Sequence, residues 1–430
     1  MSFEELKELL FARSNFGMKL GLEAMREALL ALGNPERLTR ALHVAGTNGK
    51  GSTCAFTEAA LRAAGLKTGL YTSPHLTHFC ERIRIGGQPI SEERACSLLE
   101  EIRARVPWAL GDPGLTFFEI ATLMAFLAFR ELDVMVIEVG LGGRLDATNV
   151  LEKPLACAVA PLGLEHTQYL GPTLAHIAAE KAGIFKAGVP AVSAGQPAIA
   201  ARVLQAKADE LGISLARPGR DYQFESRDVR PFCYQGKRWT VRASLALQGH
   251  HQRTNAALAC ALLEAAATGS DAERGLPLDP RHVEQGLQSA YWPGRLERIT
   301  GPGGDVWVDG AHNPHAAAAL ARSLPALAQG QPIRLVFGAL QDKDVAAMLR
   351  ELTPHVASVH YCAPDSPRAL LPEELAKLHP GQVHGSVAEA IEAARKEQGM
   401  ILCCGSLYLV GEVRAVVQGA ERIRMPSERL

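Results

Sequence analysis

Short apolar segments that alternate with helical segments are the feature that most restricts how this chain can fold. Residues 41–45 (ALHVA), 134–140 (VMVIEVG) and 156–162 (ACAVAPL) are nearly continuous apolar runs. Such runs are typical of strands that are covered on both faces of a parallel sheet. Residues 52–65 and 173–188 follow two of these runs and have helical character. The alternation predicts an α/β fold with ligands at the carboxyl ends of its strands.

The alternation is interrupted and then restarts, which predicts two domains. Residues 215–247 contain short alternating segments typical of antiparallel strands, and a helix over 252–267 closes this part. Strands and helices alternate again after SAYWPGRLE (289–297). We therefore predict a domain over 1–293 with a phosphate-loop-type, mostly parallel sheet and a small antiparallel section. A smaller, Rossmann-like α/β domain should follow over 294–430.

The segment HVAGTNGKGSTCAF reads as a strand, a glycine-rich turn and the start of a helix. Gly46, Gly49 and Gly51 let backbone amides approach phosphate oxygens, and the helix N-terminus adds positive potential. Lys50 would neutralise the outer phosphates of a nucleotide. Phosphate loops usually carry Ser or Thr after the lysine to reach the nucleotide-bound metal, but this chain has Gly51 there. The alternative is an ordinary glycine-rich turn with a solvated lysine.

Three polar residues follow apolar strands and are candidate metal ligands. Ser73 could supply the hydroxyl that Gly51 lacks, although Ser-Pro is also a common turn. Glu138 ends a run of four apolar residues, and a buried carboxylate needs a partner such as Mg²⁺, which prefers oxygen ligands. His166 follows another strand, but imidazole is a soft ligand for magnesium and a lone histidine is often structural.

Further candidates lie in the loops after these strands. The loop GLGGRLDATN carries Arg144 and Asp146, which no helix or strand pattern explains. Lys181 stands among alanines, where a lowered pKa would let its neutral amine react with CO₂ to form a carbamate; the alternative is a solvated lysine. In the second domain, Asp309 ends a strand and could hold a ribose hydroxyl. His312 follows in the turn that starts the next helix.

Composition narrows the class of protein. The formal net charge of the 430 residues is −1, so no general field favours nucleic acid or an anionic membrane. No apolar stretch approaches the roughly 18 residues of a membrane span, and the charged N-terminal residues are unlike a signal peptide. The nine cysteines are scattered without a C-x-x-C pair, which fits reduced thiols. We expect a cytoplasmic monomer with neither nucleic-acid nor membrane partners.

Ten blocks resemble one family across roughly residues 17–415. In order, they are GTNGKGS, TSPH, EVGLGGRLDATN, LEHTQYLG, EKAGIF, HHQRTNAALA, WPGRLE, DGAHNPHA, QDKD and CGSLY. They look like the blocks of folylpolyglutamate synthases and bifunctional dihydrofolate synthases, which belong to the Mur ligase superfamily. The resemblance implies an ATP- and Mg²⁺-dependent ligase that joins L-glutamate to folates or dihydropteroate through an acyl phosphate.

The resemblance also implies roles for individual residues. Metal binding would fall to Ser73, Glu138 and His166, and Lys181 matches a lysine that family members carbamylate. With Lys50, Lys181 and His166 would form the catalytic set. The expected ATP contacts are Thr47, Asn48, Gly49, Lys50, Gly51, Ser52, Asn255, Arg295, Asp309 and His312, and the expected folate contacts are Phe118, Glu119, Arg144 and Asp146. One departure is Glu165, where the family usually has Asp.

Three alternative functions can be weighed against this interpretation of the sequence. A dedicated folylpolyglutamate synthase would lack the dihydrofolate synthase activity. A peptidoglycan-type Mur ligase would carry a separate N-terminal domain, but the glycine-rich loop starts by residue 46 and leaves no room for one. A non-catalytic nucleotide-binding switch protein would not need the polar strand ends that converge in the second domain.

Overall fold

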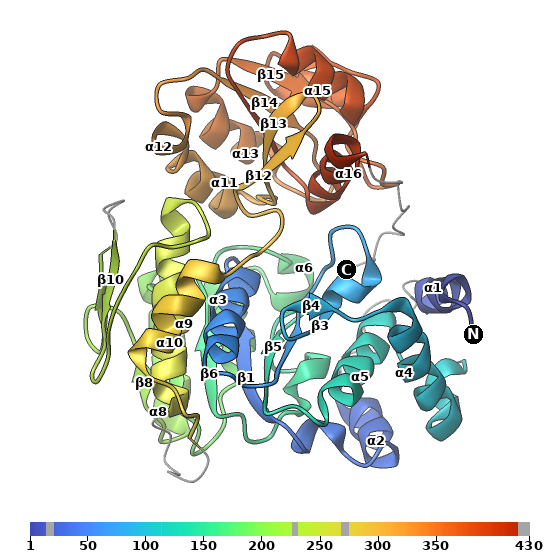
Figure 1. Ribbon diagram of the computed structural model, residues 1–430, viewed down its shortest axis with the longest axis vertical. Helices are drawn as coiled ribbons and strands as arrows, with labels where there is room; N and C mark the ends of the chain where they lie inside the picture. The colour runs from blue at the N-terminus through green and yellow to red at the C-terminus, as the bar shows by residue number, and fades with distance from the viewer. Residues whose placement is uncertain (14–20, 113, 226–230, 268–274, 420–430) are drawn as a thin grey trace.

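The computed structural model describes residues 1–13, 21–112, 114–225, 231–267 and 275–419. Figure 1 shows two α/β domains, one above the other. The first is built on an eight-stranded sheet with a separate three-stranded antiparallel sheet, and the second on a six-stranded sheet. The α/β class, the mostly parallel first sheet and the smaller second α/β domain are confirmed.

Six neighbouring strands of the first sheet are parallel, and two antiparallel strands extend one edge. The strands in order across the sheet are β4 (Gln88–Pro89), β3 (Ile83–Ile85), β2 (Thr68–Tyr71), β5 (Val134–Glu138), β1 (Arg40–Ala45), β6 (Ala156–Val159), β7 (Ala191–Ser193) and β8 (Leu215–Ala216). The sequence did not indicate the antiparallel edge.

Helices cover both faces of this sheet, which explains its continuous apolar strands. In β5, Val134 and Val136 pack on the side of α3, α9 and α10, whereas Met135 and Ile137 pack on the side of α1, α2, α4 and α5. The helices are α1 (Phe3–Ala12), α2 (Glu23–Ala31), α3 (Lys50–Ala63), α4 (Glu92–Arg105), α5 (Phe117–Phe129), α6 (Thr167–Leu170), α7 (Leu174–Ala182), α8 (Ala198–Glu210), α9 (His250–Ala267) and α10 (Pro280–Ser289), with short 3₁₀ turns at Pro35–Arg37, Phe79–Arg82, Pro107–Leu110 and Ala147–Val150.

The antiparallel section is smaller than the sequence predicts. It consists of β9 (Gln223–Phe224), β10 (Phe232–Gln235) and β11 (Thr240–Ala243). Residues 215–216, which we expected in this section, form β8 instead and pair in parallel with β7. Because a two-residue strand has no periodicity, its sequence cannot reveal which sheet it joins.

The second sheet has five parallel strands and one antiparallel edge strand, β12. Its order is β12 (Glu297–Gly301), β13 (Gly304–Asp309), β17 (Met400–Cys404), β14 (Ile333–Phe337), β15 (Ser358–Tyr361) and β16 (Gln382–Val383). Its helices are α11 (Pro314–Ala321), α12 (Leu324–Ala328), α13 (Val345–Leu352), α14 (Pro372–Leu378), α15 (Val387–Arg395) and α16 (Leu407–Gln418), with a 3₁₀ turn at Thr353–His355.

All nine cysteines are free thiols, and eight of them are buried. Among the described helices, none combines the length and apolar character needed to cross a bilayer.

Helix α10 packs closely against α3, the helix that follows the glycine-rich loop. A Cβ at Gly286 would lie 2.3 Å from the backbone nitrogen of Ala60 and 2.4 Å from its Cα. Although alanine has the higher helix propensity, Gly286→Ala should lower the free energy of unfolding by about 2 kcal/mol, because the backbones must separate. Urea denaturation followed by circular dichroism measures the loss. The exposed Gln288→Ala in the same helix is the control, and equal midpoints for both variants would contradict the packing argument.

Candidate active site

The glycine-rich loop joins the end of β1 to the start of α3. The amides of Thr47 and Asn48 both donate to the carbonyl of Pro161 at 3.1 Å, so the loop is tied to the segment after β6. Gly49 caps α3 in the left-handed region (φ 84°), and the first intrahelical bond runs from Thr53 to Gly49. The amides of the first helical turn therefore point out of the helix, which is the arrangement that binds anions.

Gly51 departs from the usual phosphate-loop pattern for a steric reason. A Cβ at this position would lie 2.8 Å from Nε1 of Trp292, which comes from the connection between the domains. Serine or threonine cannot fit there unless Trp292 moves. Lys50, one residue earlier, lines the cavity, and its Nζ donates to the carbonyl of Thr47 at 3.2 Å.

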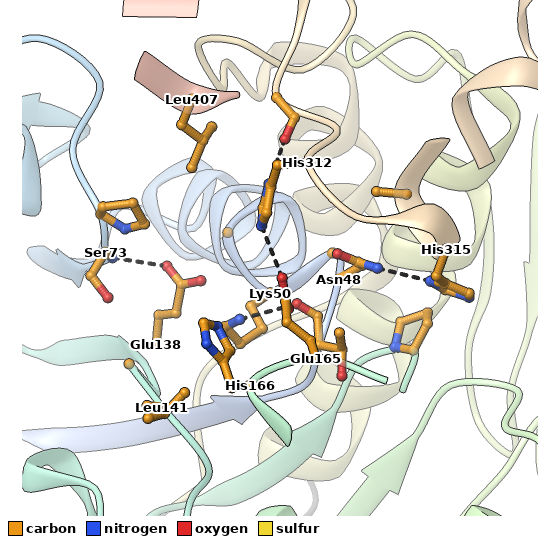
Figure 2. A pocket seen from close by; sticks show the side chains of 18 of the residues that line it. Asn48, Lys50, Ser73, Glu138, Leu141, Glu165, His166, His312, His315 and Leu407 are labelled. Atoms are coloured by element: carbon orange, nitrogen blue, oxygen red, sulfur yellow. Dashed lines mark hydrogen bonds and ion pairs between the residues drawn. The ribbon is translucent and has the colours of Figure 1, made fainter. Parts of the chain in front are cut away.

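Ser73 and Glu138 stand side by side at the ends of two paired strands (Figure 2). The amide of Ser73 donates to Oε2 of Glu138 at 3.2 Å. Burial raises the pKa of Glu138, and the positive charge of Lys50 acts in the opposite direction. The nearby positive charge therefore does not offset the burial of this carboxylate, as expected of a group that binds a cation.

His166 completes the predicted metal-binding set on the same wall of the cavity (Figure 2). Its backbone is left-handed (φ 51°), and burial lowers its pKa to about 4, so the ring is neutral at pH 7 and can act as a ligand. The described residues contain no cluster of three His, Cys, Asp or Glu side chains that could hold a metal. One carboxylate, one hydroxyl and one imidazole fit Mg²⁺ nevertheless, because Mg²⁺ keeps several waters and binds nucleotide phosphates.

Lys181 lies behind the glycine-rich loop rather than in solvent. Lys181 belongs to α7 and its side chain is buried. Its Nζ donates to the carbonyl of Gly46 at 2.8 Å. Burial, helped by the nearby charge of Lys50, lowers the pKa of Lys181 to about 7. The alternative of a solvated lysine is therefore wrong, and a large fraction of this amine is neutral and reactive near pH 7.

The second domain contributes the opposite wall. Asp309 ends β13, and its two carboxylate oxygens accept hydrogen bonds from the amides of Leu296 and Ala311, both at 2.9 Å. Arg295 packs against Gly310, where a Cβ would lie 2.1 Å from its guanidinium. These contacts fix both side chains at the cavity edge where the sequence places the nucleotide.

Asn255 connects α9 to the start of α3. Its amide donates to Gln252 at 2.9 Å, and Gln252 donates to the hydroxyl of Ser52 at 3.2 Å. A Cβ at Gly49 would lie 2.2 Å from Oδ1 of Asn255, so only glycine lets this amide approach the loop.

A hydrogen-bond network crosses directly between the domains (Figure 2). Glu165 pairs with Nε2 of His312 at 3.1 Å and accepts from the amide of Asn313 at 3.0 Å. Asn313 and Asn48 exchange amide hydrogen bonds at 3.1 and 3.2 Å, and Asn48 also contacts Nδ1 of His315 at 2.8 Å. Nδ1 of His312 faces the carbonyl of Gly310 at 2.7 Å. Both ring nitrogens of His312 are therefore engaged by oxygen atoms of the protein.

The predicted folate residues line the other end of the cavity. Phe118 packs over Gly140, where a Cβ would lie 2.4 Å from its ring. Glu119 accepts from Thr116 at the start of α5, so it is also a helix-capping residue. Arg144 pairs with Glu180 at 2.9 Å. Burial raises the pKa of Asp146, which accepts the amides of Leu141 and Thr148 and so shapes its own loop.

The residues that the sequence assigns to ATP, metal and folate all line a single cavity of about 1000 Å³ between the domains, and Lys181 lies outside this lining. The fold therefore brings together the residues that the sequence assigns to ATP, metal and folate. Sequence reasoning missed Arg13, Trp292 and Arg368. Arg13 and Arg368 line the cavity, and Arg13 donates to the carbonyls of Ala109 and Leu115. No local pattern marks Arg13, because these partners lie 96 and 102 residues away in the chain.

Comparisons with known proteins agree with this arrangement. The family model of the Mur ligase glutamate ligase domain matches residues 294–407. A dihydrofolate synthase/folylpolyglutamate synthase of Bacillus subtilis is 34% identical, over 96% of this chain and 98% of the relative. A folylpolyglutamate synthase of Lacticaseibacillus casei is 36% identical, over 91% of this chain and 93% of the relative.

Solved structures have the same fold over nearly the whole chain. The complex of E. coli FolC with DHPP and ADP superposes with a TM-score of 0.86 at 34% identity, covering 97% of this chain and 98% of that one. A bifunctional folylpolyglutamate synthase/dihydrofolate synthase from Yersinia pestis, with AMPPNP and an Mn ion, gives 0.84 at 33% identity, covering 96% and 98%. The chain therefore belongs to the family of folylpolyglutamate and dihydrofolate synthases, ATP-dependent ligases that share the Mur ligase glutamate ligase domain.

Proposed function

We propose that this protein uses ATP to join L-glutamate to folates, and that it also joins L-glutamate to dihydropteroate. One observation carries the proposal: a single interdomain cavity presents the glycine-rich loop, the Ser73–Glu138 wall and the polar strand ends of a glutamate ligase domain to one another. An amide ligase needs this arrangement, because nucleotide, acid and amine must meet at one point.

The reaction has two steps. A carboxylate oxygen of the folate attacks the γ-phosphorus of ATP, the bond to the β-phosphate oxygen breaks, and acyl phosphate and ADP form. The glutamate amine then attacks the acyl carbon, phosphate leaves, and the amine loses a proton. Lys50 and the amides at the start of α3 stabilise the transferring phosphoryl group by electrostatics and positioning. The second domain excludes water from the acyl phosphate.

We propose that Ser73, Glu138 and His166 hold the Mg²⁺ that accompanies ATP. When bound, the ion supplies positive charge to the phosphate oxygens. Two observations support this assignment. Burial raises the pKa of Glu138 despite the nearby charge of Lys50, and the ring of His166 is neutral. Thr47, Asn48, Asn255, Arg295, Asp309 and His312 would position the nucleotide. The two ring nitrogens of His312 are engaged with protein atoms, Glu165 and the carbonyl of Gly310.

We also propose that Lys181 is carbamylated and that the carbamate helps to hold a metal rather than acting as a base. The burial of the amine and its lowered pKa support this modification. The resulting anion would stand behind the glycine-rich loop, beside the carbonyl of Gly46.

A dedicated folylpolyglutamate synthase is the second candidate function, because the relative from L. casei carries only that name. The relative from B. subtilis carries both activities in its name. The folate end of the cavity, with Phe118, Glu119, Arg144 and Asp146, is compatible with either acceptor.

ADP release by the purified protein separates these functions. With ATP, Mg²⁺ and L-glutamate, we expect glutamate-dependent ADP release both with dihydropteroate and with a reduced folate. Release with the reduced folate alone would make the protein a dedicated folylpolyglutamate synthase. ATP binding without glutamate-dependent release for either acceptor would favour the nucleotide-binding switch and contradict the proposal.

We further propose that the chain works as a cytoplasmic monomer with domains over 1–293 and 294–430. The separate sheets and cores on the two sides of this boundary support the division, although residues 420–430 lie outside the described part of the chain. The net charge of −1 supports the expectation that nucleic acid and membranes are not partners.

A further inference from the structure

Glu165 links the loop of the predicted metal ligand His166 to the second domain. Its carboxylate reaches two partners, His312 and Asn313, and both belong to the other domain. Asn313 is joined in turn to Asn48 of the glycine-rich loop. We call Asn48, Glu165, His312, Asn313 and His315 the interdomain clamp.

The clamp can exist only when the two domains are together. The side chain of Glu165 retains 9% of its exposure, and a buried carboxylate is costly unless it is paired. Separation of the domains removes both hydrogen-bond partners of Glu165, and solvent must then replace them. Domains within one chain move relative to each other unless their interface is extensive. The pairing of Glu165 therefore forms only when the two domains are closed.

The clamp also fixes the geometry of the reaction centre. Glu165 directly precedes His166, whose backbone is left-handed (φ 51°). Asn48 lies two residues before Lys50, in the loop that starts α3. The contacts of the clamp therefore join the His166 loop, the glycine-rich loop and the first turn of α11.

We propose that Glu165 is a positioning residue that couples domain closure to the phosphate site, so that the acyl phosphate persists only while water is excluded. The proposal rests on the proposed function. Without the clamp, water attacks the acyl phosphate, the carboxylate is regenerated, and phosphate leaves without formation of an amide. ADP is then released in excess over product.

The length of the Glu165 side chain sets both of its contacts with the second domain. Glu165→Asp shortens the side chain by one carbon–carbon bond, about 1.5 Å. Contacts of 3.0 and 3.1 Å then open beyond hydrogen-bond distance. Glu165→Gln keeps the length of the side chain and the hydrogen bond from Asn313 but loses the negative charge that faces His312.

The ratio of amide formed to ADP released tests the clamp. We expect a ratio near one for the unaltered protein, a ratio about tenfold lower for Glu165→Asp, and an intermediate ratio for Glu165→Gln, because charge-assisted hydrogen bonds are lost. His312→Gln should also lower the ratio, and the double variant Glu165→Asp/His312→Gln should be no worse than the worse single variant. An unchanged ratio in Glu165→Asp, or additive effects in the double variant, would overturn the proposal.

Small-angle scattering tests the clamp independently of the ligase reaction. With AMPPNP and Mg²⁺, the unaltered protein should have a smaller radius of gyration than Glu165→Asp. Ser323→Ala is the matched control, because it removes a different interdomain hydrogen bond, which the amide of His250 donates at 2.9 Å. Equal radii for the unaltered protein and Glu165→Asp would refute the clamp even if ligase activity were present. A difference in radii with no ligase activity would refute the proposed function instead.

Discussion

Lys50→Met will reduce glutamate-dependent ADP release by about 10³-fold, because phosphoryl transfer depends on fixed positive charge beside the transferring group. Lys50 stands in the first turn of α3 and lines the cavity beside Glu138. Its charge is also the main influence that lowers the pKa of this buried carboxyl group. Removal of the ammonium should also weaken the binding of the nucleotide phosphates. Methionine keeps most of the length and the apolar stem, so the fold should survive.

Steady-state ADP release at saturating substrate, together with thermal unfolding, measures this effect. Lys153→Met is the control, because Lys153 is exposed in the loop before β6 and lies outside the cavity. It should retain the activity and melting temperature of the unaltered protein. If Lys50→Met keeps more than a tenth of the activity, Lys50 does not stabilise the transferring group.

Much of the site could be predicted because its residues follow apolar strands. The runs ending at Ala45 and Glu138 form β1 and β5, which pair in parallel register. Parallel strands place their carboxyl ends at one edge of the sheet, so residues distant in sequence had to meet there. The same reasoning placed Asp309 at the end of β13 in the second domain.

The contacts between domains could not be predicted in this way. Glu165 and His312 are joined only because the two domains meet at the cavity, and no sequence period encodes that arrangement. The burial of the Lys181 side chain also depends on a contact with a residue that is distant in the sequence. Alanine neighbours indicate a partly apolar setting, but the carbonyl of Gly46, 135 residues earlier in the chain, fixes the amine in the interior.

Carbamylation of Lys181 should make the activity depend on CO₂ and on pH. Only the neutral amine has the lone pair that attacks CO₂, giving a carbamate and releasing a proton. Burial lowers the pKa of Lys181 from 10.5 to about 7, so the reactive fraction rises as the pH increases through this value. Protein that is stripped of CO₂ at pH 6 should be inactive. Bicarbonate at pH 8 should restore its glutamate-dependent ADP release.

The ¹³C NMR signal of a carbamate formed from ¹³C-bicarbonate measures the modification directly. Lys181→Ala should lose the signal and lower turnover by about 10²-fold, through loss of the anion behind the glycine-rich loop. Acetate should restore part of this activity, because it returns a carboxylate to the space left by the side chain. Lys186→Ala is the control and should retain the signal, since Lys186 lies beyond α7. Full activity at pH 8 without any signal would mean that Lys181 acts as a plain amine that ties α7 to Gly46.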